Sequence, residues 1–204
     1  MKELNIIISG VGGQGNILLE QIIGQAAMGE GYQVRAADTF GAAQRGGSVL
    51  SHLRLGHEIS SCLIPWGGSH IVLGLEPSEA LSAAAKFLRP DGLVVVNTAP
   101  VLPAKVKTGE MAYPSFDVIS DLLKKLTKNI IHLDATALAR ENGTERSMNV
   151  VMLGALTGSG ALPFSPETVK QAILKQMGPK LAELNYRPFE AGLAVGQKHP
   201  VAGF

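Results

Sequence analysis

An apolar run that leads directly into a glycine-rich turn is the feature that most constrains this chain. Residues 4–9 are mostly apolar, and Gly10, Gly12 and Gly15 then follow the spacing G-x-G-x-x-G. Apolar residues recur at helical spacing over residues 17–27, which predicts a helix after the turn. In this context one glycine allows the tight turn, one lets a phosphate approach bare backbone, and one lets the helix pack close to the strand.

The predicted helix would point its unpaired N–H groups and the positive end of its dipole at the turn, which suits an anion. We therefore take the loop residues as candidates for binding a nucleotide-like phosphate: Gly10, Gly12, Gly13, Gln14 and Gly15. The alternative is a turn whose glycines serve packing alone. A dinucleotide site also needs an acidic residue about 20 positions on. The nearest candidate, Asp38, comes late, which weakens a simple nicotinamide interpretation.

Composition limits the classes of function. With 204 residues, 46% of them hydrophobic and no linker-like stretch, residues 1–204 are expected to form a single domain. Charged residues make up 17%, and a lightly charged surface suggests a partner subunit, or a homodimer of the isolated chain. The net charge of +1 shows no footprint for nucleic acid, and no segment is long and apolar enough for a membrane span. The single cysteine, Cys62, favours the cytoplasm and cannot hold a metal cluster unaided.

Strand and helix patterns alternate from the N-terminus to about residue 135. This alternation predicts a doubly wound, mostly parallel, Rossmann-like α/β sheet with helices on both faces. Residues 38–47 are predicted to be an irregular loop, and residues 90–92, with the sequence Pro-Asp-Gly, a turn. The C-terminal part is predicted to be helical, and its segment 149–156 is apolar nearly all round. That segment is therefore expected to be buried, with a neighbour packed closely against it.

Two further candidates for ligand binding lie outside the first loop. Arg45 and Gly46 occur in the segment Gln-Arg-Gly-Gly-Ser at residues 44–48, where the planar guanidinium suits a phosphate or carboxylate. Asn149 is a polar residue near the start of the apolar helix. The alternatives are a solvated turn for Arg45 and a helix cap for Asn149. The histidines lack the spacing of metal ligands, so no metal site and no catalytic residue is assigned.

Together these motifs identify a family. The chain resembles the gamma-type subunits of 2-oxoacid:ferredoxin oxidoreductases, and within that family the enzymes that act on indolepyruvate. The resemblance rests on the loop at residues 10–15, on residues 41–49, on the Glu-Pro-Ser-Glu-Ala segment at 76–80 and on residues 149–156. These segments occur in the same order along nearly the whole chain.

The resemblance implies a subunit of an enzyme that decarboxylates a 2-oxoacid, forms acyl-coenzyme A and passes electrons to ferredoxin. Thiamine diphosphate and the iron–sulfur clusters would belong to an alpha-type partner subunit, which agrees with the single cysteine. Coenzyme A carries phosphates and a nucleotide, so it gives the glycine loop and Arg45 a task that does not require NAD. Two other classes remain open: a stand-alone NAD(P)-dependent oxidoreductase, and a non-catalytic scaffold subunit in which the loop only packs.

Overall fold

The computed structural model describes residues 3–41, 47–103, 106 and 108–201. Its centre is a six-stranded sheet in the order β2-β3-β1-β4-β5-β6. The strands are β1 (Glu3–Val11), β2 (Gln33–Phe40), β3 (Ser48–Gly56), β4 (Ser69–Gly74), β5 (Leu88–Asn97) and β6 (Asn129–Leu133). β1, β4, β5 and β6 pair in parallel, whereas β3 pairs antiparallel with both β1 and β2. The prediction of a mostly parallel α/β sheet is confirmed.

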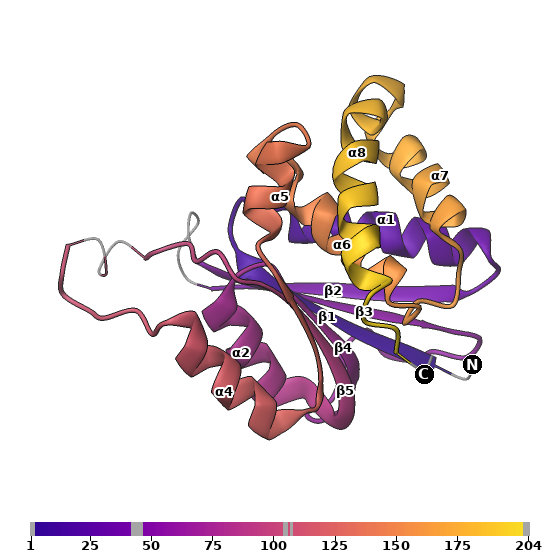
Figure 1. Ribbon diagram of the computed structural model, residues 1–204. Helices are drawn as coiled ribbons and strands as arrows, with labels where there is room; N and C mark the ends of the chain where they lie inside the picture. The colour runs from indigo at the N-terminus through magenta and orange to yellow at the C-terminus, as the bar shows by residue number, and fades with distance from the viewer. Residues whose placement is uncertain (1–2, 42–46, 104–105, 107, 202–204) are drawn as a thin grey trace.

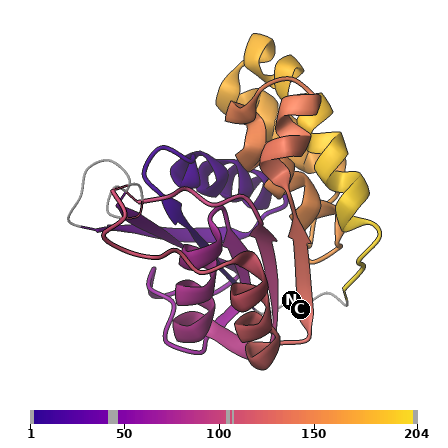
Figure 2. The same ribbon diagram turned by 60° about the vertical axis from the view of Figure 1, so that its left-hand side comes forward.

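Helices cover both faces of this sheet, as predicted (Figure 1). Along the chain they are α1 (Asn16–Gly29), α2 (Pro77–Phe87), α4 (Phe116–Leu126), α5 (Ala135–Glu141), the short 3-10 helix η1 (Glu145–Ser147), α6 (Met148–Gly158), α7 (Pro166–Met177) and α8 (Pro179–Gly196). α1, α6, α7 and α8 pack on one face, and α2 and α4 on the other (Figures 1 and 2). Alternate residues of β1 serve the two layers, because Ile6 and Ile8 join the core under α1 while Ile7 joins the core under α2.

The helical C-terminal part is joined to the first layer through α6, which is buried along almost its whole length. Glycines let its backbone touch that of α8. A Cβ added at Gly154 would lie 2.1 Å from the carbonyl oxygen of Phe189, and one at Gly192 would lie 1.9 Å from that of Val151. The expectation of a buried helix with a close neighbour is confirmed, and the neighbour is α8.

Three details differ from the predicted arrangement. β3 lies between β1 and β2, so the first βαβ unit spans an intervening antiparallel strand. β2 continues to Phe40, into the stretch predicted as loop, because its residues pair with β3 up to Val49. The segment 90–92 lies inside β5 at a register shift rather than in a separate turn. There the carbonyl of Gly92 accepts a hydrogen bond from the hydroxyl of Thr127 (2.7 Å), so the bulge is bonded to the segment between α4 and β6.

Candidate functional site

The glycine loop lies at the carboxyl end of β1, which is the central switch point of the sheet. From β1 the chain continues through α1 on one face, whereas β4 continues through α2 on the other. Gly13 and Gly15 have φ values of 100° and 87°, a left-handed conformation that favours glycine. α1 begins at Asn16 without a side-chain cap and without an acidic residue in its first turn. The predicted strand, turn and helix are confirmed, and this helix end favours an anion.

Gln14 fastens the loop to the sheet. Its Oε1 accepts a hydrogen bond from the backbone N–H of Val11 (2.8 Å), and its Nε2 donates to the carbonyl of Leu75 after β4 (3.0 Å). A Cβ at Gly10 would lie 2.7 Å from the same Oε1, so Gly10 makes room for this fastening. The backbone N–H of Gly12 donates to the carbonyl of Gly47 (2.9 Å). Gln14 and Gly10 therefore shape the loop. The sequence analysis had grouped these two residues with the candidates for ligand contact.

Asn149 lies against this loop although it is far away in the sequence. It is 4% exposed, and its Oδ1 accepts a hydrogen bond from the N–H of Val150 (2.9 Å). A Cβ at Gly15 would lie 2.2 Å from the Nδ2 of Asn149. The start of α6 thus packs directly on the start of α1, and Asn149 supports the loop from behind.

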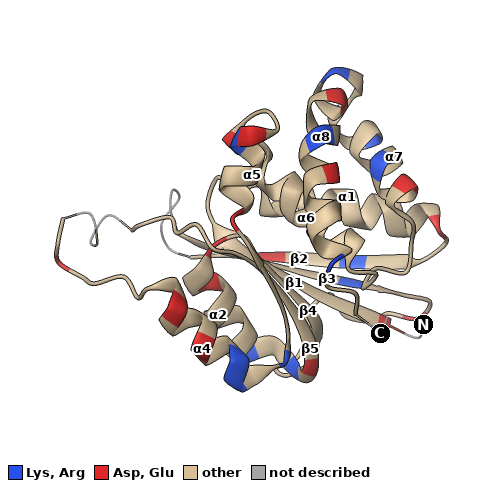
Figure 3. Cartoon of the chain, viewed as in Figure 1, with Lys and Arg blue, Asp and Glu red and all other residues tan. Residues whose placement is uncertain are grey.

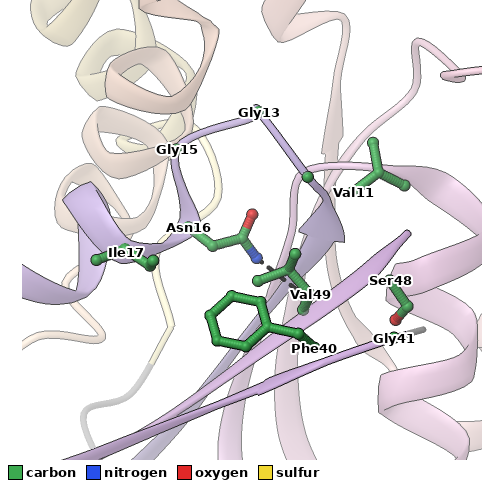
Figure 4. Close-up of a pocket in the computed structure, with 10 residues that line it drawn as sticks. Val11, Gly13, Gly15, Asn16, Ile17, Phe40, Gly41, Ser48 and Val49 are labelled. Atoms are coloured by element: carbon green, nitrogen blue, oxygen red, sulfur yellow. Dashed lines mark hydrogen bonds between the residues drawn. The ribbon is translucent and has the colours of Figure 1, made fainter. Parts of the chain in front are cut away.

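A pocket of about 500 Å³ opens beside the loop (Figure 4). Its lining comes from the loop, from the first turn of α1 and from the paired ends of β2 and β3: Val11, Gly12, Gly13, Gly15, Asn16, Ile17, Phe40, Gly41, Ser48 and Val49. Phe40 is 63% exposed and Ile17 is 41% exposed. The pocket therefore combines an electropositive helix end with exposed apolar side chains, a combination that fits a ligand with both anionic and apolar parts.

Asn16 is a pocket residue that sequence reasoning missed. It is 3% exposed, and its Nδ2 donates to the carbonyls of Ile8 (3.3 Å) and Val49 (3.2 Å), across two strands. Its Oδ1 is buried and has no hydrogen-bond partner within the described ranges. The sequence did contain a signal for Asn16: it is a polar residue on the sheet-facing side of a helix start that is otherwise apolar.

Acidic side chains border the pocket on the α2 side. The hydroxyl of Ser48 donates to Glu79 Oε2 (2.6 Å), and the N–H of Glu79 donates to Glu76 Oε2 (3.0 Å). The pKa of Glu79 is raised, mainly by burial, while the Ser48 hydrogen bond opposes the shift and Glu76 adds to it. The hydroxyl of Tyr113 also bonds to Glu76, and burial followed by this bond raises the pKa of Tyr113 to about 12. The network fixes the start of α2 beside the pocket.

Asp38, the late candidate for a ribose contact, is engaged elsewhere. Its Oδ1 accepts a hydrogen bond from the hydroxyl of Ser51, and its carboxyl group meets that of Glu20 on α1. Because β3 separates β2 from β1, Asp38 also lies one strand further from the glycine loop than in a dinucleotide site. Both facts disfavour the nicotinamide interpretation.

The remaining candidates are placed as follows. Arg45 and Gly46 lie outside the described residues. Within the described ranges no group of three or more His, Cys, Asp or Glu side chains could hold a metal ion. Cys62 is a free cysteine.

Lys, Arg, Asp and Glu are spread over the chain without a single basic face in the view of Figure 3. None of the described helices is both long and apolar enough to cross a bilayer.

The fold and this site define the class of the protein: an α/β protein whose glycine loop and pocket lie at the switch point of its sheet. Within that class, the chain belongs to the pyruvate ferredoxin/flavodoxin oxidoreductase family, which matches residues 5–195. It is 42% identical over 189 residues to the indolepyruvate oxidoreductase subunit IorB of Archaeoglobus fulgidus, with 93% of each chain covered. It is 36% identical over 199 residues to the subunit of the same name from Pyrococcus horikoshii, covering 97% of this chain and 98% of the relative.

Solved structures agree on the fold. The gamma subunit of keto/oxoacid ferredoxin oxidoreductase from Geobacter sulfurreducens superimposes with a TM-score of 0.69 at 23% identity, covering 96% of this chain and 99% of that subunit. The 2-oxoglutarate:ferredoxin oxidoreductase of Magnetococcus marinus gives a TM-score of 0.73 at 21% identity, covering all of this chain and 32% of that longer one. The predicted family and its α/β fold are confirmed.

Proposed function

We propose that this chain is the coenzyme A-binding subunit of a 2-oxoacid:ferredoxin oxidoreductase, with indolepyruvate or a related arylpyruvate as the 2-oxoacid. The observation that carries the proposal is the pocket of about 500 Å³ at the uncapped start of α1. Its anion-favouring end and its exposed Phe40 and Ile17 suit a ligand with phosphates and apolar parts. Two further observations support it: the Magnetococcus marinus protein was solved with coenzyme A bound, and the relatives above are indolepyruvate oxidoreductase subunits.

In this proposal the loop holds the ligand. Gly13 and Gly15 let a phosphate approach the backbone at the start of α1, and Gln14 and Asn149 keep the loop in shape. Gly10 and Gly12 provide the space at the end of β1. Arg45, with Gly46 beside it, is assigned a charge-assisted contact with a phosphate or carboxylate, on the strength of its sequence.

The chemistry at the 2-oxoacid belongs to the partner. An alpha-type subunit would supply thiamine diphosphate and iron–sulfur clusters, and electrons would leave to ferredoxin. The single cysteine of this chain supports that division, because a cluster needs several thiolates. The same cysteine usage supports a cytoplasmic complex. The chain would act as a single domain whose part is to bind and orient coenzyme A.

The alternative is a scaffold subunit whose loop only packs. The hydrogen bonds of Gln14 and of the Gly12 N–H favour it, since they show that part of the loop is committed to the sheet. The two functions predict different effects of a side chain added at the loop. Such a side chain weakens the use of coenzyme A only if the loop holds this ligand.

The decisive variant is Gly12→Val, assayed in the complex assembled with the alpha-type partner. A branched side chain in the pocket should raise the KM for coenzyme A at least about tenfold, a loss of about 1.4 kcal/mol, while decarboxylation without coenzyme A is unchanged. Gly29→Val is the matched control at the other end of α1, where an added Cβ would meet no described residue outside its own helix within 4 Å. Arg45→Lys should also raise this KM, because lysine lacks the planar fork. An unchanged KM in a folded Gly12→Val complex would leave the scaffold function standing.

A further inference from the structure

A pair of carboxyl groups lies behind the wall of the pocket, and the proposed function gives neither of them a role. Glu20 extends from the second turn of α1 and Asp38 from β2, and the two side chains are hydrogen-bonded to each other. The hydroxyl of Ser51 on β3 donates to Asp38, its cross-strand partner. Glu20 Oε2 is buried without a partner among the described residues. We call Glu20 and Asp38 the carboxyl pair.

Two carboxylates in contact repel each other unless one of them holds a proton. With one shared proton, the pair forms a strong hydrogen bond between a neutral acid and a carboxylate. Burial, and next the charge and hydrogen bond of Asp38, raise the pKa of Glu20 to about 7. The pair therefore loses its shared proton as the pH rises through about 7.

The position of the pair connects it to the pocket. Asp38 and Phe40 are two residues apart, so their side chains project from the same face of β2, toward α1. β2 is an edge strand, and β3 is its only neighbour in the described sheet. Its residues are mostly exposed or half-buried, so little apolar packing holds it. The bond from Asp38 to Glu20 is a polar contact between the pocket end of β2 and α1.

We propose that Glu20 and Asp38 are positioning residues: one shared proton latches the end of β2 to α1 and so fixes Phe40 and Gly41 as a wall of the pocket. Loss of that proton leaves two adjacent negative charges, which push the wall away from α1. This role does not depend on which ligand occupies the pocket.

Among the described residues, Asp38 is the charged group that acts on Glu20, so the shared proton controls the charge of the pair. α1 packs against β1, β2, β3, α6 and α7. β1 presents apolar side chains to it, β3 presents Ser51, and α6 contains no titratable residue. On α7, Lys170 pairs with Glu190, while Glu167 and Lys175 lie beside Gln25 and Gly29 in the second half of α1. His52 of β3 points to the opposite face and packs on Phe87 of α2; burial, and next the charge of Lys86, lower the pKa of His52, and the charge of Asp38 opposes this shift.

Amide hydrogen exchange on the full chain tests the latch without any ligand. The reporter is the N–H of Gly41, which donates to the carbonyl of Ser48 (2.8 Å), and the internal control is the N–H of Leu75, which donates to Ser9 (2.7 Å). After correction for intrinsic exchange, protection at Gly41 should fall about tenfold between pH 6 and pH 8. The reason is that the pair is about 90% protonated one pH unit below a pKa near 7 and only about 10% protonated one unit above it. Protection at Leu75 should stay constant.

Glu20→Gln and Asp38→Asn each replace the shared proton with an amide donor that persists at every pH. Both variants should keep the protection at Gly41 constant from pH 6 to pH 8, whereas Glu183→Gln on the exposed side of α8 should behave like the wild type. Carboxyl NMR should show a titration near pH 7 in the wild type that both variants lose. A flat wild-type profile at Gly41, or a pH dependence that persists in both variants, overturns the proposal. Neither outcome bears on coenzyme A binding, which the Gly12→Val experiment tests separately.

Discussion

Gly15→Ala probes a contact between two distant parts of the chain, the start of α1 and the start of α6. Gly15 has a φ of 87°, and an added Cβ would lie 2.2 Å from Asn149 Nδ2. The left-handed conformation costs a non-glycine residue about 1 to 2 kcal/mol, and the overpacking adds about 1 to 2 kcal/mol more. Asn149 can turn away only by giving up its hydrogen bond to the N–H of Val150. We expect a loss of about 2 to 4 kcal/mol in the free energy of unfolding.

Two companion variants separate strain from contact in urea denaturation. Gly13→Ala carries the strain alone, because φ is 100° and none of the described residues beyond its chain neighbours places an atom within 4 Å of its Cβ. It should therefore cost about 1 to 2 kcal/mol. In a double-mutant cycle, Asn149→Ala should recover part of the loss caused by Gly15→Ala, giving a coupling energy of about 1 kcal/mol. A Gly15→Ala variant that is no less stable than Gly13→Ala, with no coupling to residue 149, would refute the reasoning.

Two further predictions concern stability. Gly154→Ala should cost about 3 kcal/mol or more or prevent folding, because its Cβ meets the backbone oxygen of Phe189 at 2.1 Å and forces α6 away from α8; Gly29→Ala, with open space around it, should be neutral or slightly stabilising in the same thermal melt. The pKa of Glu20 is higher in the folded chain (about 7) than its ordinary value of 4.5, so its contribution to stability is fully present below pH 4.5 and is lost as the pH rises through 7. Between pH 5 and pH 8, the free energy of unfolding of Glu20→Gln should therefore rise by about 1 to 2 kcal/mol relative to that of the wild type. This gain is smaller than the full pKa shift implies, because the side chain is partly exposed. A constant difference between the two proteins across that range would contradict this assignment.

The local pattern of the sequence determined the elements and the class of fold. The apolar run, the spaced glycines and the helical period after them identify β1, the loop and α1, because each signal depends on residues close together in the chain. The same holds for the helical C-terminal part and for the buried α6. The motifs were also specific enough to identify the family. Arg45 and Gly46 stay predictions from sequence, since they lie outside the described residues.

Only the tertiary structure decided which distant residues meet. No local signal places β3 between β1 and β2, because strand order depends on how the whole sheet buries its two faces. That placement moves Asp38 away from the glycine loop and against Glu20, which turns a candidate ribose contact into half of a carboxyl pair. Likewise Asn149 supports Gly15, and Asn16 reaches two strands, through contacts that span up to 134 residues or cross the sheet. Sequence periodicity reports which face of an element is buried, whereas the partner of that face is set by packing of the entire chain.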